Sequence, residues 1–233
     1  MNYKRELIAF MLSSGALKFG DFITKSGRRS PYFINTGAFD TGEKIRRLGA
    51  FYAACIIDNA ERGRLPKDIK AIFGPAYKGI PLAVSASAAL SSDFGLDVGY
   101  CFNRKEAKDH GEGGRLVGCD LKPGDKTIVV DDVITAGSAI REVMPLLRAM
   151  PGVDTAGLVI AVDRMERGRG ALSATEEVRR DLGIEVLPIV NAREIIAESK
   201  DIAIGGEPAL DEKCRRRMEE YMAKYCARDI NPC

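Results

Sequence analysis

The sequence has only one histidine, His110, among its 233 residues, and no two of its cysteines form a Cys-x-x-Cys pair. A structural zinc site takes four cysteine and histidine ligands at short spacings, so we expect no such site. The six cysteines are scattered along the chain rather than grouped as in small disulfide-bonded domains. We therefore expect a reduced protein of the cytoplasm.

Long apolar runs, a strong charge of one sign and internal repeats are also missing. No stretch approaches the roughly 20 apolar residues that cross a bilayer, and the N-terminal segment is too short and too acidic for a signal peptide. The net charge is only +2, which gives no general reason to expect a nucleic acid or a membrane as partner. Neither the Gly-x-Gly-x-x-Gly pattern of dinucleotide-binding folds nor the Walker A pattern occurs.

The chain does contain an alternation of strand and helix patterns. A hydrophobic content of 45% with 29% charged residues fits a well-buried core in one α/β domain over residues 1–233. Strands that alternate with helices favour a mostly parallel sheet covered by helices on both faces. Amphipathic patterns predict a further helix near each end of the chain. The expected strands are 69–73, 98–102, 127–131, 155–163 and 184–189, and the expected helices between them are 41–60, 80–90, 138–150 and 174–182.

Residues 128–139, Ile-Val-Val-Asp-Asp-Val-Ile-Thr-Ala-Gly-Ser-Ala, join a strand to a helix through a short turn. The turn gathers backbone N–H groups, two hydroxyls and the positive end of the helix dipole, which suits a phosphate monoester. Asp131 and Asp132 stand at the carboxyl end of the strand, where open α/β sheets bind ligands. Because carboxylates repel phosphate, the two acids need another partner, such as sugar hydroxyls or Mg²⁺. A phosphate site beside two such acids indicates a ribose 5-phosphate as the ligand. The plain alternative is a buried strand whose polar end caps a helix.

The stretch 103–121 breaks the alternation because it is charged, rich in glycine and nearly free of apolar residues. A loop of this length in a compact domain is usually functional or disordered. Its cations and the only histidine favour a mobile lid that closes over a polyanion, with a surface hairpin of no function as the alternative. The side chains in question are Arg104, Lys105, Lys108 and His110.

Two further segments place polar groups after apolar strands. The turn 74–79, Gly-Pro-Ala-Tyr-Lys-Gly, can present N–H groups and Lys78 to a pyrophosphate. Arg164 can form a bidentate pair with a planar carboxylate. The alternatives are an ordinary turn with an exposed lysine, and an ion pair of Arg164 with Asp163 or Glu166.

Together these segments resemble the type I phosphoribosyltransferases, and among them the family that uses orotate. The Asp-Asp turn motif is common to the whole group, whereas the segments 74–79 and 104–114 match the orotate enzymes. Two more segments match in the same order: Lys-Ser-Gly-Arg with Ser-Pro-Tyr-Phe within 25–33, and Asp-Arg-Met-Glu-Arg-Gly at 163–168. The resemblance runs from the N-terminus to about residue 200.

The resemblance implies a type I phosphoribosyltransferase fold, with a mostly parallel central sheet flanked by helices, a small hood from the terminal segments and a long mobile lid. It implies transfer of the 5-phosphoribosyl group from 5-phosphoribosyl 1-diphosphate to orotate, giving orotidine 5′-monophosphate and pyrophosphate in pyrimidine biosynthesis. Mg²⁺ would arrive with the substrate, without assigned protein ligands. A homodimer is also implied, in which lid residues serve the partner's site.

The resemblance also assigns residues. The catalytic residues are Lys105, Lys108, His110, Asp131 and Asp132. Orotate contacts Phe33, Ile34, Thr135 and Arg164, although Ile34 replaces an aromatic residue that is common in bacterial relatives. The donor contacts Lys25, Tyr77, Lys78, Arg104, Lys105, Lys108, His110, Asp131, Asp132, Val133, Ile134, Thr135, Ala136, Gly137, Ser138 and Ala139.

Three other functions share parts of the pattern. A phosphoribosyltransferase for a purine or uracil would keep the Asp-Asp motif, but Arg164 and the lid argue against it. A regulator that binds nucleic acid should show a basic face or a helix-turn-helix segment, and the sequence shows neither. The third is one half of a bifunctional pathway enzyme. The chain is too short to contain a decarboxylase barrel of roughly 250 residues, so this alternative needs a separate partner chain.

Overall fold

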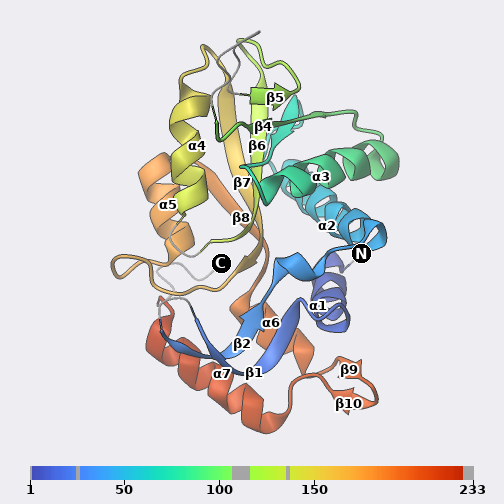
Figure 1. Ribbon diagram of the computed structural model, residues 1–233, viewed down its shortest axis with the longest axis vertical. Helices are drawn as coiled ribbons and strands as arrows, with labels where there is room; N and C mark the ends of the chain where they lie inside the picture. Colours follow the sequence, from blue (N-terminus) through green and yellow to red (C-terminus); the bar gives the residue numbers. More distant parts are fainter. Residues whose placement is uncertain (1, 25–26, 107–115, 135–136, 228–233) are drawn as a thin grey trace.

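The structure is a computed structural model that describes residues 2–24, 27–106, 116–134 and 137–227. A six-stranded sheet in the order β5-β4-β3-β6-β7-β8 forms its centre (Figure 1). Neighbouring strands run parallel except at the edge, where β5 pairs antiparallel with β4. The strands are β3 (Ala71–Phe73), β4 (Gly99–Asn103), β5 (Leu116–Gly118), β6 (Lys126–Val133), β7 (Asp154–Asp163) and β8 (Glu185–Asn191).

Two helices pack on each face of this sheet (Figure 1). Side chains alternate along a strand, so Ile128 and Val130 join the core on one face while Val129 and Leu158 join the core on the other. Both faces are therefore apolar, which explains the continuous β-branched runs. No helix in the described ranges is long and apolar enough to cross a membrane. The helices are α2 (Gly42–Glu61) and α3 (Gly79–Phe94) on one face, and α4 (Ser138–Arg148) and α5 (Ala174–Leu182) on the other.

The terminal segments form the predicted hood, which lies below the sheet in Figure 1. A hairpin of two strands packs against the last helix, and the rings of Tyr32 and Tyr221 meet edge to face at 6.1 Å. Two more helices connect this hood to the sheet, and a short hairpin precedes the last helix. These elements are α1 (Tyr3–Ser13), β1 (Leu17–Ile23), β2 (Arg29–Ile34), α6 (Ala192–Ser199), β9 (Ala203–Ile204), β10 (Glu207–Pro208) and α7 (Glu212–Tyr225).

Each strand and helix predicted from the sequence is present, with its ends shifted by a few residues at most. The hairpin of β1 and β2 and the helix α6 were not predicted. Asn191 and Glu194 form a capping box at the start of α6. That spacing of an N-cap residue and a glutamate is a sequence signal that could have revealed the helix.

The charged stretch 103–121 is not one continuous loop. Asn103 ends β4, and β5 pairs with it so that Val117 lies opposite Phe102. The prediction of a loop over all of 103–121 was wrong, because Asn103 belongs to β4 and residues 116–118 form β5, whose Leu116 packs against the core. Residues 107–115, with most of the predicted lid, lie outside the described residues.

Candidate functional site

The two adjacent acids of β6 border a hollow at the carboxyl end of the sheet. Asp131 still pairs with Ile160 of β7, and both acids are partly buried. The hollow has a volume of about 220 Å³. Its walls are the end of β6, the turn before α3 and the start of α4, and its lining residues are Pro75, Ala76, Tyr77, Lys78, Asp131, Asp132, Val133, Ile134, Gly137, Ser138 and Ala139.

The start of α4 closes one side of this hollow. Gly137 is the N-cap residue and has a φ of 67°, a left-handed conformation that glycine adopts without strain. A Cβ atom there would lie 2.5 Å from Cγ2 of Val178, so space also requires glycine. Ser138 and Ala139, in the first turn of α4, line the hollow. The backbone N–H groups at the start of a helix can bind an anion.

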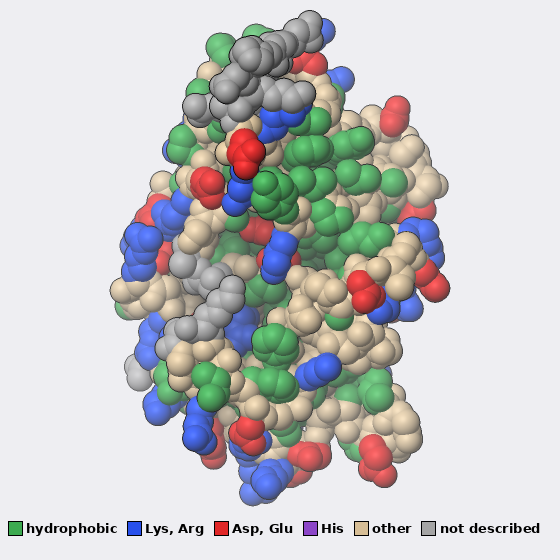
Figure 2. Space-filling view, in the orientation of Figure 1, with side chains coloured by type: hydrophobic (Ala, Val, Ile, Leu, Met, Phe, Trp, Pro, Cys, Tyr) green, Lys and Arg blue, Asp and Glu red, His purple; other side chains and the backbone are tan. Residues whose placement is uncertain are grey.

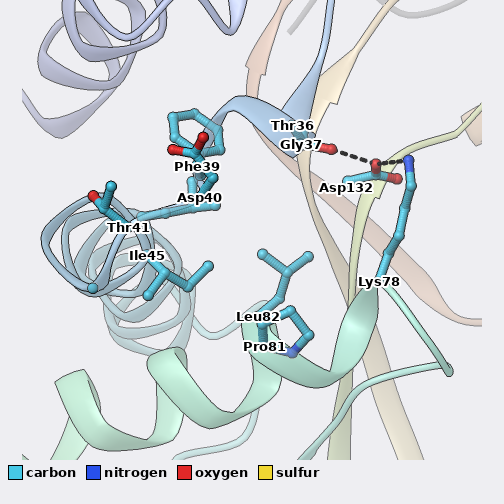
Figure 3. A pocket seen from close by; sticks show the side chains of 12 residues that line it. Thr36, Gly37, Phe39, Asp40, Thr41, Ile45, Lys78, Pro81, Leu82 and Asp132 are labelled. Atoms are coloured by element: carbon cyan, nitrogen blue, oxygen red, sulfur yellow. Dashed lines mark hydrogen bonds and ion pairs between the residues drawn. The ribbon is translucent and has the colours of Figure 1, made fainter.

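Asp132 is the meeting point of three segments. Its Oδ2 atom accepts hydrogen bonds from Thr36 Oγ1 at 2.7 Å and from Lys78 Nζ at 3.0 Å (Figure 3). Thr36 follows β2, so its hydroxyl attaches the hood hairpin to the end of β6. A second hollow of about 410 Å³ shares Lys78 and Asp132 and is otherwise mainly apolar, with Phe39, Ile45, Pro81 and Leu82 in its walls (Figure 3).

The two carboxyl groups have opposite pKa shifts. Burial and the neighbouring charge of Asp132 raise the pKa of Asp131 to about 6. Burial opposes the charge of Asp132 as well, but the hydrogen bonds from Thr36 and Lys78 outweigh it and lower the pKa of that carboxyl group. Asp132 is therefore an anchored carboxylate, whereas Asp131 is the acid whose charge further hydroxyl donors would stabilise.

Replacing Asp131 by asparagine is expected to stabilise the protein at pH 8. The folded-state pKa of Asp131 lies above the unfolded value of about 3.9, so folding favours the protonated form. That contribution is full below about pH 4 and is lost as the pH rises through about 6. A neutral asparagine keeps this contribution at every pH. We therefore expect the unfolding free energy of the variant to exceed that of the wild-type protein by about 1–3 kcal/mol at pH 8, with no gain near pH 4. Urea denaturation at both pH values measures the difference, and equal stability at pH 8 would contradict the burial argument.

The turn 74–79 offers fewer free N–H groups than its sequence suggests. The N–H of Ala76 donates to Asn103 Oδ1 at 2.9 Å, and the N–H of Gly79 donates to a carbonyl within the turn. The peptide bond between Ala76 and Tyr77 is cis. The N–H groups of Ala76 and Gly79 therefore already have acceptors, and the side chain of Lys78 is the cationic group of the turn.

Two contacts join the start of the charged stretch to this turn. Asn103, the last residue of β4, supplies the acceptor for Ala76. Lys105 Nζ lies 5.7 Å from the ring centroid of Tyr77, which is 68% exposed. Arg104 and Lys105, the first two cations of the predicted lid, are exposed. Lys105 lies beside the turn that carries Lys78.

Arg164 follows β7 and is buried under the hood, with 9% of its surface exposed. Its Nη2 and Nε atoms lie 2.7 Å and 2.8 Å from Oε1 of Glu166. Nη2 also donates to Ser30 Oγ at 3.2 Å, and Cζ lies 4.2 Å from the ring centroid of Tyr32. Of the two alternative ion pairs, the one with Glu166 is therefore present, whereas Asp163 accepts hydrogen bonds from other groups.

Phe33 and Ile34 end β2 shortly before Thr36. Phe33 is 42% exposed, and its ring stacks on Phe22 with centroids 5.4 Å apart. Ile34 packs against the hydrophobic core. The aromatic surface at this end of β2 is thus made by Phe22 and Phe33, and the first of these was not predicted.

The structure brings the predicted residues together in two groups, one around the hollow and one under the hood, and the contact between Thr36 and Asp132 connects them. No sequence pattern indicated Thr36 or Tyr52. The hydroxyl of Tyr52 donates to the carbonyl of Asp131 at 2.6 Å. The predicted site residues outside the described part of the chain are Lys25, Lys108, His110, Thr135 and Ala136.

Known proteins resemble this chain over nearly its whole length. The sequence profile of the phosphoribosyl transferase domain matches residues 35–172. The orotate phosphoribosyltransferase of Clostridium beijerinckii is 48% identical over 226 residues, which cover 97% of this chain and 99% of that protein. The orotate phosphoribosyltransferase of Bifidobacterium adolescentis is 50% identical over 220 residues, which cover 94% and 95% of the two chains.

Solved structures share the same architecture. The crystal structure of orotate phosphoribosyltransferase from Francisella tularensis has a TM-score of 0.80 and 37% identity, covering 95% of this chain and 100% of that one. The UMP synthase of Leishmania donovani has a TM-score of 0.71 and 19% identity, covering 94% of this chain and 42% of that one. At that level of identity the second likeness concerns the fold alone.

Proposed function

The chain belongs to the orotate phosphoribosyltransferases, within the phosphoribosyl transferase domain family, and from that premise we propose how its residues act. It transfers the 5-phosphoribosyl group from 5-phosphoribosyl 1-diphosphate to orotate, giving orotidine 5′-monophosphate and pyrophosphate in pyrimidine biosynthesis. The observation that carries the residue assignment is the hollow where Lys78, the acid pair and the start of α4 meet.

The ribose 5-phosphate of the donor fits this hollow. The N–H groups at the start of α4 bind the 5-phosphate. Asp131 and Asp132 accept hydrogen bonds from the ribose hydroxyls, and such donors relieve the burial that raises the pKa of Asp131. Lys78, with 74% of its side chain exposed, is free to turn from Asp132 toward the pyrophosphate.

The leaving pyrophosphate gains negative charge as its bond to the anomeric carbon breaks. Lys78, Arg104 and Lys105 stabilise that charge from the turn and from the start of the lid, and Lys108 and His110 add to it. The two aspartates offset the positive charge that develops on the ribose ring. Lid closure then keeps water away from this oxocarbenium-like centre.

The environment of Arg164 suits orotate, which carries a carboxylate that uracil lacks. Arg28 and Arg164 share the single carboxylate of Glu166, so this cluster has a net charge of +1. A partly buried surplus of positive charge favours one further carboxylate. We therefore assign the orotate carboxylate to Arg164 and the ring to Phe33, with Thr135 and the backbone near Ile34 completing the site.

Mg²⁺ fits this site as a companion of the substrate. The described residues contain no group of three or more side chains that could hold the ion by themselves. Two adjacent carboxylates, Asp131 and Asp132, together with substrate phosphates form the kind of donor set that Mg²⁺ prefers. When bound, the ion would neutralise charge on the pyrophosphate.

An exposed apolar stripe on α3 supports the proposed homodimer. Pro81, Val84 and Ala88 face outward on one side of the helix, next to a groove of about 590 Å³ between α2 and α3. Figure 2 shows hydrophobic side chains gathered over this part of the molecule. Apolar patches of this kind mark protein interfaces, and a two-fold contact here would place the turn with Lys78 near the partner chain.

We propose residues 1–233 as one phosphoribosyltransferase domain in the cytoplasm, with small-molecule substrates and neither nucleic acid nor membrane as partner. The five described cysteines are all free, as in a reducing compartment. The net charge of +2 offers no general attraction to polyanions.

The purified protein is expected to consume orotate only when both the donor and Mg²⁺ are present. Because the orotate carboxylate pairs with a buried guanidinium, kcat/KM for orotate should exceed that for uracil by about 100-fold or more. The loss of orotate absorbance, measured beside reactions with uracil, hypoxanthine and adenine, tests both statements. Equal or faster turnover of a purine base would overturn the substrate assignment.

A further inference from the structure

Glu166 lies at the centre of the contacts around Arg164. Its Oε1 atom accepts hydrogen bonds from Arg164 Nε at 2.8 Å and from the Tyr221 hydroxyl at 2.7 Å. Its Oε2 atom accepts one from Arg28 Nη1 at 3.0 Å. One carboxylate thus joins the end of β7, the helix α7 and the turn between β1 and β2.

These contacts hold the guanidinium of Arg164 on one edge. Glu166 occupies the Nε and Nη2 atoms, and Ser30 accepts a second hydrogen bond from Nη2. The ring of Tyr32 covers a face of the group, 4.2 Å from Cζ. A guanidinium has five N–H donors in a rigid plane. In the described part of the chain, the hydrogen bonds of Arg164 to Glu166 and Ser30 use Nε and Nη2. We therefore assign the two N–H groups of Nη1 to a ligand.

We propose that Glu166 is a positioning residue for orotate recognition. It fixes the Nε–Nη2 edge of Arg164, so that Nη1 presents its donors to the carboxylate of the base. The inference rests on the proposed function, because it assumes that Arg164 binds orotate.

A purely structural role for Glu166 would be to dock α7. Backbone contacts already do this without the carboxylate, since Arg167 N donates to Tyr225 O at 3.0 Å and Ala227 N donates to Met165 O at 3.0 Å. Removing the carboxylate should therefore leave α7 in place and free the guanidinium of Arg164. The effect should fall on orotate and not on the donor, whose hollow lies at the acid pair.

The variant Glu166→Ala is expected to raise KM for orotate by about 10- to 100-fold, because a charged hydrogen-bond acceptor that orients the binding group is lost. KM for the donor should stay within about twofold. Glu166→Gln keeps an acceptor oxygen for Arg164 and should recover most of the orotate affinity. A matched control is Glu177→Gln: Glu177 is 8% exposed and accepts bonds from the N–H groups of Arg169 and Gly170, so this change should lower Tm and leave KM for orotate unchanged.

A double-mutant cycle separates positioning from general loosening. If Glu166 acts through Arg164, adding Glu166→Ala to Arg164→Ala should cause no further loss of kcat/KM for orotate. Additive losses would overturn the proposal, and so would a control variant that raises KM for orotate as much as Glu166→Ala does. A wild-type protein that does not turn over orotate would instead contradict the proposed function, so the two failures are distinguishable.

Discussion

Replacing Arg164 by alanine is expected to lower kcat/KM for orotate by about 30- to 1000-fold, which corresponds to about 2–4 kcal/mol for a charged hydrogen-bonded pair in a closed site. The side chain is buried and held by Glu166, Ser30 and Tyr32, so its guanidinium is ordered before the base arrives. Donor affinity, measured by calorimetry, should change by less than about threefold. Steady-state kinetics with orotate as the varied substrate measure the loss of kcat/KM.

A matched control for this variant is Arg167→Ala. Arg167 belongs to the same segment and donates to the carbonyl of Lys224, so its loss weakens the docking of α7 without removing a group under the hood. It should lower Tm and leave kcat/KM for orotate nearly unchanged. If Arg164→Ala weakens the donor as much as orotate, its ion pair with Glu166 is structural and the assigned role of Arg164 is wrong.

Mixing two inactive variants, Lys108→Ala and Arg164→Ala, is expected to restore about a quarter of wild-type activity. Random exchange in a two-fold dimer makes about half of the dimers mixed, and one of their two sites is intact if the lid serves the partner. Lys108 lies outside the described residues, whereas Lys105 lies beside Tyr77 of its own chain. If the lid is shared between subunits, the sharing begins beyond Lys105.

This experiment requires proof that subunits exchange. Differently tagged variants, captured in two steps, isolate the mixed dimer, whose activity is then measured directly. In a mixed dimer with shared lids, half of the sites should work at the wild-type rate. Activity at the level of the parent variants, in a captured mixed dimer, would show that the lid acts within its own chain and that the shared site is wrong.

The sequence by itself determined the sheet, its flanking helices and the place of the acid pair. Burial imposes a period on apolar residues, and that period is a local property of the chain. Strands such as β6 and β7 are buried on both faces, so their continuous β-branched runs were readable. Asp131 and Asp132 interrupt such a run before a glycine-containing turn, and both acids line the hollow at the carboxyl end of the sheet.

Only the tertiary structure decided which distant side chains complete the site. Thr36 bonds Asp132, Asn103 bonds Ala76, and Glu166 gathers Arg28 with Arg164 and Tyr221. These partners are far apart in the sequence or are joined through a third segment, so their contacts depend on how the hairpin, sheet and last helix pack. Thr36, Asn103 and Glu166 are single polar side chains that belong to no repeating pattern, so the sequence does not reveal their contacts. The energy that selects such a pair exists only after the apolar core has brought its segments together.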